Sequence, residues 1–109
     1  MQNIPWKNDN FIILIIKFKK LIMISVVIRN RNEGDALKNV LTILTKIYYE
    51  DIKEIIIVDN NSTDNSITIA NNFNCKIVTI NDFSYGRATN LGISNADSKY
   101  VLLLSSHSI

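Results

Sequence analysis

Two clusters of polar side chains each follow a run of apolar residues, and they hold the residue types that could do chemistry. The clusters are residues 29–34 and residues 59–64. Asparagine, aspartate and glutamate offer donors and acceptors for a base edge and for ribose hydroxyls, and arginine can offset the charge of a phosphate. The clusters therefore predict a nucleotide site, with these candidate residues: Asn30, Arg31, Glu33, Asp59 and Asn60.

Part of the second cluster also fits a polar turn that leads into a helix. Ser62, Thr63 and Asp64 have the side-chain oxygens that cap helices, and we prefer this structural role for these three. Asp59 and Asn60 exceed what a cap requires, so they stay candidates for ligand binding. The three glycines lie in separate segments, which argues against nicotinamide-binding and P-loop motifs.

The hydrophobic pattern predicts the scaffold that would position these clusters. Four almost continuously apolar runs indicate strands covered by helices on both faces: residues 24–28, 54–58, 76–80 and 100–104. Helices are expected between them, at residues 34–48, around residues 67–73 and at residues 86–96. We therefore predict a doubly wound α/β fold with a mostly parallel sheet, in which ligands bind beyond the carboxyl ends of the strands.

Apolar residues at helical spacing define the inward faces of these helices. The first helix would point inward with Ala36, Leu37, Val40, Leu41, Ile43, Leu44 and Ile47, and the second with Ile67, Ile69, Ala70 and Phe73. Cys75 is the single cysteine of the chain and sits in an apolar run, so we expect a small buried side chain rather than a disulfide or a metal ligand.

Three segments in series resemble the signatures of family 2 glycosyltransferases, which have the Rossmann-like GT-A fold. They read SVVIRNRNE at residues 25–33, IIIVDNNSTD at residues 55–64 and YGRATNLGI at residues 85–93, the last followed by SKYVLLL at residues 98–104. The resemblance covers residues 24–109 in order. It implies the amino-terminal, nucleotide-sugar-binding half of such an enzyme.

The resemblance also implies roles for the matching residues. The first loop and Asn60 would surround the base, with Asp59 beside it, and an asparagine carbonyl can accept the N3–H of uracil or thymine. Arg87 and Asn90 would face the ribose and the diphosphate, although a solvated charge on a helix is an equal alternative for Arg87. Arg31 stands where many members have an aromatic residue, and arginine can stack on a base as well.

The largest departure from the family follows the fourth strand, where Ser105, Ser106 and His107 replace the usual Asp-x-Asp triplet. That triplet holds a divalent metal ion, which stabilises the charge of the departing nucleoside diphosphate. His107 could bind manganese, and magnesium less readily, through its neutral imidazole, or it could be an exposed histidine without a ligand. Ser105 and Ser106 would hydrogen-bond the ribose or a phosphate.

Bulk properties limit the remaining alternatives. A net charge of +2 over 109 residues gives no sign of a nucleic-acid partner. We expect residues 1–22 to be a leader or a poorly ordered extension and residues 23–109 to be the domain, starting at Met23. The apolar run at residues 11–16 is too short to span a bilayer, so we expect a cytoplasmic protein, with weak association with the inner membrane surface as an alternative.

No catalytic residue can be assigned from this sequence. Inverting transfer needs a base that deprotonates the acceptor hydroxyl, and in the family that carboxylate lies in the second half of the domain. We therefore expect a truncated domain that binds a UDP- or dTDP-sugar with low or no activity alone. Two alternatives stay open: a non-catalytic Rossmann-like binding or interaction module, and one half of a split enzyme that pairs with a complementary carboxyl-terminal half.

Overall fold

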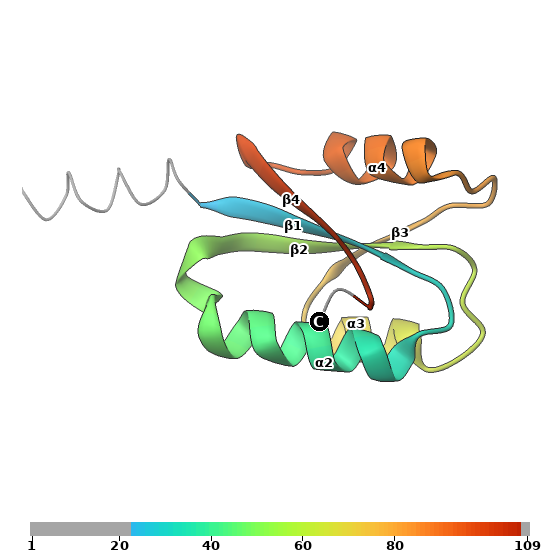
Figure 1. The fold of residues 1–109 in the computed structure, drawn as a ribbon, viewed down its shortest axis with the longest axis horizontal. Coiled ribbons are helices and arrows are strands. Elements are labelled where there is room, and N and C mark those ends of the chain that lie inside the picture. Colours follow the sequence, from blue (N-terminus) through green and yellow to red (C-terminus); the bar gives the residue numbers. More distant parts are fainter. Residues whose placement is uncertain (1–22, 108–109) are drawn as a thin grey trace, which may run out of the picture.

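The computed structural model describes residues 23–107, in which strands and helices alternate along the chain (Figure 1). The strands are β1 (Ile24–Asn30), β2 (Ile52–Asp59), β3 (Lys76–Thr79) and β4 (Tyr100–Ser105). The helices are α2 (Gly34–Ile47), α3 (Ser66–Asn72) and α4 (Tyr85–Ser94), and a short 3-10 helix, η2 (Tyr49–Asp51), precedes β2.

The four strands form one parallel sheet in the order β3-β2-β1-β4. β1 is central and pairs with β2 on one side and with β4 on the other, so that Arg29 is level with both Val58 and Ser105. The chain thus moves outward from β1 to β3 and then returns to the opposite side of β1. This is the predicted α/β fold, and such a reversal places a ligand crevice beyond the carboxyl ends of the strands.

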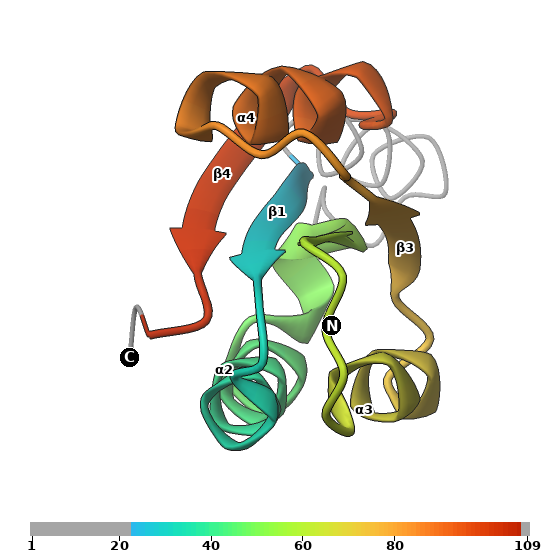
Figure 2. The same cartoon turned by 90° about the vertical axis from the view of Figure 1, so that its right-hand side faces the viewer.

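Helices cover the sheet on both faces: α2 and α3 lie on one face and α4 lies on the other (Figure 2). Alternate residues of the central strands supply the two cores. Val26 and Ile28 point toward α2 and α3, whereas Val27 points toward α4, and all three are completely buried. Each such side chain contributes about 1.5–3 kcal/mol relative to an exposed one.

Of the eleven helix residues predicted to point inward, seven lie in or against the core, and Ala36, Ile43 and Ile67 are half-buried outside it. Leu37, Val40, Leu41 and Leu44 are buried. Ile47 is 66% exposed, so its predicted inward position was wrong. The reason is that α2 ends at Ile47, and the chain then turns through η2 toward β2.

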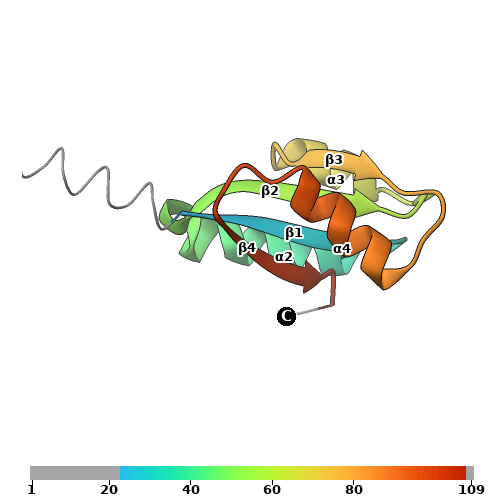
Figure 3. The same cartoon turned by 90° about the horizontal axis from the view of Figure 1, so that it is seen from above.

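β4 lies at an edge of the sheet and is less covered than its apolar sequence predicts. Leu102 and Leu103, which point to opposite faces, are 40% and 45% exposed. In Figure 3, β4 runs along the outer edge, beside the strand that α4 crosses. The prediction that every strand is covered on both faces was therefore wrong for β4, because an apolar run does not reveal which strand occupies an edge.

Two further predictions concern the membrane and the amino terminus. No helix within residues 23–107 is both long and apolar enough to cross a membrane. The predicted leader or extension, residues 1–22, lies outside the described residues.

Candidate functional site

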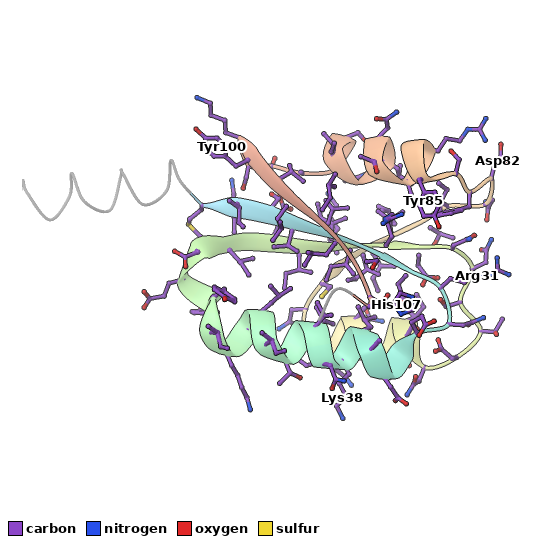
Figure 4. The ribbon with its side chains drawn as sticks, viewed as in Figure 1. Arg31, Lys38, Asp82, Tyr85, Tyr100 and His107 are labelled. Carbon is purple, nitrogen blue, oxygen red and sulfur yellow. The ribbon has the colours of Figure 1, made fainter. Side chains whose placement is uncertain are left out.

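A cavity of about 430 Å³ lies beyond the carboxyl ends of the strands, where the fold predicts a ligand. Seven of the predicted site residues line it: Asn30, Arg31, Glu33, Asn60, Ser105, Ser106 and His107. Three residues that the sequence did not single out as ligand contacts also line it: Arg29, Phe83 and Tyr85. Figure 4 shows Arg31, Tyr85 and His107 at the same end of the molecule.

Backbone hydrogen bonds hold the loops around the cavity in register. The N–H of Asn60 donates to the carbonyl oxygen of Asn30 at 2.9 Å, and the N–H of Ser106 donates to that of Arg29 at 3.1 Å. Both bonds continue the strand pairing one residue past the strand ends. The first residues of each loop are therefore as rigidly placed as the sheet.

A buried network of side chains ties the same loops together. Asp59 is 2% exposed, and its carboxylate accepts hydrogen bonds from the backbone N–H of Ser62 (2.9 Å), the hydroxyl of Ser62 (2.6 Å) and the amide of Asn30 (3.1 Å). The side-chain oxygen of Asn30 accepts from the hydroxyl of Ser106 at 2.7 Å. The network thus crosses from β2 over β1 to the end of β4.

This network uses the hydrogen-bonding groups of three side chains that were predicted to bind a ligand, those of Asn30, Asp59 and Ser106. The amide of Asn30 donates to Asp59 and Ser62 and accepts from Ser106, so its polar atoms already have protein partners. Asp59 does not line the cavity, and the hydroxyl of Ser106 is committed to Asn30 and to the carbonyl oxygen of Arg29. Their side chains hold the site in shape.

Asn32 and Asp64 join the two polar clusters outside the cavity. The side-chain oxygen of Asn32 accepts the backbone N–H groups of Thr63 (2.7 Å) and Asp64 (3.2 Å), and its φ of 49° lies in the left-handed region. Asp64 accepts the N–H of Gly34 at 2.9 Å and both the N–H and the hydroxyl of Ser66. The hydrogen bond from the Ser66 hydroxyl is the main cause that lowers the pKa of Asp64.

The predicted cap of α3 comes from Asp64 alone. The N-cap residue is Asn65, whose side chain makes no capping hydrogen bond, while Asp64 accepts the first N–H of the helix, that of Ser66. Ser62 and Thr63 were predicted as caps as well. They are instead bonded to the loops after β1 and β2, because those loops pack against one another.

Asn60 and Asn61 differ in direction although they are neighbours. Asn60 lines the cavity. The amide of Asn61 donates to the side-chain oxygen of Asn81 at 3.1 Å, in the loop after β3, and its φ is 52°. Only Asn60 is therefore placed to contact a ligand in the cavity.

An aromatic pair forms one wall of the cavity. The rings of Phe83 and Tyr85 meet edge to face, with centroids 5.3 Å apart, and the guanidinium of Arg29 lies 4.6 Å from the centroid of the Tyr85 ring. A cation over an aromatic ring at an exposed site contributes about 0.5–1 kcal/mol. The available sequence signal was two aromatic residues in the segment between a predicted strand and a predicted helix, and such residues are common in loops.

Arg87 and Asn90 do not reach the cavity. Arg87 forms an ion pair with Asp82 at 2.9 Å, and the two side chains are 61% and 85% exposed. Asn90 is exposed on α4. Neither residue is among those that line the cavity, so their roles toward ribose and diphosphate stay predictions.

The residues after β4 offer few ligands to a divalent metal ion. His107 Nε2 lies 3.6 Å from Glu33 Oε1, and the two side chains are 64% and 42% exposed. Within residues 23–107 no group of three histidine, cysteine, aspartate or glutamate residues could hold a metal. A cation beside His107 would have two protein ligands and would face two guanidinium groups in the same cavity. This donor set does not fit a metal held by the protein alone.

Solved structures of similar fold include glucosyl-3-phosphoglycerate synthase and mannosyl-3-phosphoglycerate synthase. Glucosyl-3-phosphoglycerate synthase from Mycobacterium tuberculosis, in complex with Mn2+, UDP and glucosyl-3-phosphoglycerate, aligns at 21% identity and TM-score 0.68 over 77% of this chain and 33% of that chain. The complex of the same enzyme with UDP aligns at 19% identity and TM-score 0.72, over 100% of this chain and 41% of that chain. Mannosyl-3-phosphoglycerate synthase from Rubrobacter xylanophilus aligns at 19% identity and TM-score 0.69, over 79% of this chain and 31% of that chain.

These similarities establish the GT-A fold, and this chain spans roughly a third of the length of the structures that it matches. Among curated protein sequences, none matches it. The family model described as glycosyl transferase family 2 matches residues 25–109, well over half of the chain. The chain therefore belongs to glycosyl transferase family 2.

Proposed function

We propose that the cavity binds the nucleoside diphosphate of a UDP- or dTDP-sugar, as the donor site of a transferase that moves the sugar to an acceptor hydroxyl. The observation that carries this proposal is the convergence of Asn60, Arg29 and Arg31 on one cavity beyond the strand ends. An amide beside two guanidinium groups suits a base edge next to a diphosphate. Family membership supports the proposal, as does the UDP named in the solved structures.

The proposed roles follow from the surroundings of each side chain. The amide oxygen of Asn60 accepts the N3–H of uracil or thymine, while its backbone is held by Asn30. Glu33 and Ser105 line the cavity and would bond ribose hydroxyls or phosphate oxygens. Asn30, Asp59 and Ser106 act through the buried network that positions the loops.

Two further proposals rest on the sequence alone. Arg87 and Asn90 would face the diphosphate. No metal role is proposed for His107, because the donor set around it does not fit a divalent cation. The protein would be cytoplasmic, with weak association with the inner membrane surface as the alternative. The acceptor follows from none of these residues.

Complete transfer would need a general base and an acceptor site in addition to the donor site. Both are proposed to lie in a complementary carboxyl-terminal half, because this chain matches roughly a third of each solved relative. The chain alone would then bind the donor with little or no turnover. A non-catalytic binding module predicts the same binding, and turnover after a complementary half is added separates the two.

Isothermal titration calorimetry of the full chain tests the donor site. UDP and dTDP should bind more tightly than ADP and GDP, because purines do not present the pyrimidine N3–H to Asn60. A lysine on the far side of α2 provides a control: Lys38→Gln removes a positive charge away from the cavity and should leave UDP affinity unchanged (Figure 4). Equal affinity for all four nucleotides would refute the proposed base recognition.

A further inference from the structure

The charge of the cavity lining favours an anion. Arg29 and Arg31 contribute two permanent positive charges, and Glu33 contributes the only carboxylate among the lining residues. The carboxylate of Asp59, next to Asn60 in the chain, is buried and already accepts three hydrogen bonds. Two guanidinium groups beside a single carboxylate would repel a free divalent cation and attract a diphosphate.

The end of β4 adds no compensating negative charge. Ser105 and Ser106 are neutral, and the Ser106 hydroxyl is bonded to Asn30. Glu33 already faces His107 at 3.6 Å. A metal ion that bridges a diphosphate normally relies on carboxylates for its protein ligands. Here the protein offers one carboxylate and one imidazole.

Arg29 is held in place by the aromatic wall. Its guanidinium lies over the Tyr85 ring at 4.6 Å, and Phe83 supports that ring from its edge. At the end of β1, the backbone of Arg29 is also fixed, because its carbonyl oxygen accepts the N–H of Ser106. An arginine held at both ends needs little ordering when a phosphate binds, and less ordering gives a tighter complex.

We propose that Arg29 and Arg31 neutralise the diphosphate in this chain, so that nucleoside diphosphate binding does not require a divalent metal ion. This inference rests on the proposed donor site and specifies how it handles charge. Tyr85 is then a positioning residue, since it acts through Arg29. Each guanidinium makes charge-assisted hydrogen bonds, whose loss lowers the affinity for UDP about tenfold.

The test measures the affinity of the full chain for UDP and for uridine, with EDTA and then with manganese. The affinity for UDP should be the same in both conditions. Arg29→Gln and Arg31→Gln should each weaken UDP about tenfold and leave uridine unchanged, while Lys38→Gln should change neither. Arg31 is exposed in a loop, so its variant remains informative even where Arg29→Gln unfolds the protein.

Two outcomes separate failure of this inference from failure of the donor site. Binding of UDP that requires manganese would overturn the inference and leave the donor site standing. Absence of any UDP binding by folded protein in both conditions would overturn both.

Variants of Tyr85 test the positioning role. Tyr85→Leu removes the ring under the guanidinium and should weaken UDP several-fold, without an effect on uridine. Tyr85→Phe keeps the ring and should restore the affinity for UDP. Equal losses of UDP and uridine affinity in Tyr85→Leu would show that the ring contacts the base instead, and would contradict the positioning role.

Discussion

The N–H of Asn60 donates to the carbonyl oxygen of Asn30 at 2.9 Å, so the loop after β2 begins hydrogen-bonded to the end of β1. This bond fixes the backbone of Asn60 whatever side chain the residue carries. Its neighbour Asn61 turns toward Asn81 in the loop after β3. Asn60 is therefore placed to contact a ligand, whereas Asn61 connects two loops.

Asn60→Ala should weaken UDP binding by roughly three- to tenfold, the value of one lost hydrogen bond. Because the backbone bond to Asn30 remains, the stability of the protein should change little. Asn61→Ala is the matched control and should affect UDP binding much less. Calorimetry measures the affinity of both variants for UDP, and equal losses of affinity would contradict the proposal that Asn60 contacts the base.

Gly92→Ala should destabilise the protein by about 1–3 kcal/mol, the usual cost of overpacking a core. A Cβ at this position would lie 2.3 Å from a methyl carbon of Val27, which is completely buried. Gly86 is in the same helix, and a Cβ added there would meet no atom within 4 Å. Gly86→Ala should therefore stabilise the protein by about 0.5–1 kcal/mol. Urea unfolding measures the free energy of unfolding of both variants. A similar loss of stability in the two would show that the packing of α4 on β1 does not cause the loss in Gly92→Ala.

Asp64→Asn should destabilise the protein at neutral pH, and the difference should disappear in acid. The pKa of Asp64 is lowered from 3.8, chiefly by the hydrogen bond from the Ser66 hydroxyl. A lowered pKa means that the folded protein favours the carboxylate. Its contribution is thus complete above pH 3.8 and is lost as the pH falls through the folded-state value.

Thermal unfolding of the wild type and of Asp64→Asn, measured between neutral and acid pH, compares their stabilities. Asp51→Asn serves as control, since Asp51 is exposed and the described residues show no hydrogen bond to its carboxylate. A difference between wild type and Asp64→Asn that persists unchanged below the folded-state pKa would contradict the proposed contribution of the carboxylate.

Cys75 should react slowly with iodoacetamide in the folded protein. Burial raises the pKa of its thiol to about 12, and the side chain packs against the core formed by α2 and α3. The reactive thiolate is thus scarce at about pH 8, and alkylation should be at least about a hundredfold slower than in denaturant. Rapid alkylation of folded protein would show that the segment between α3 and β3 opens readily.

The central part of the fold could be predicted from sequence because its strands are buried on both faces. β1 and β2 begin and end within two residues of the predicted runs, and α2 ends one residue early. Ile47 and Leu103 were expected inside and are exposed. The spacing of apolar residues along the chain does not indicate where a helix stops covering the sheet or which strand lies at the edge.

The candidate site could be predicted in position but not in the direction of every side chain. Asn60 and Arg31 follow strand ends and line the cavity, as strand order alone suggests. Asp59 occupies an equivalent position but points into the buried network, a choice set by Ser62 and Asn30 in three dimensions. Tyr85 gained its importance only through its contact with Arg29, which comes from a different part of the sequence.

A titration of isotopically labelled full-length chain with UDP, followed by two-dimensional NMR, tests the donor site most directly. Shifted amides should cluster at the cavity: residues 29–33, residue 60, residues 83–85 and residues 105–107. Amides around Lys38 and Tyr100, which lie away from the cavity, should not move (Figure 4). A folded protein whose spectrum is unchanged by UDP, or whose shifts cluster at the opposite ends of the strands, would show that the cavity is not the donor site.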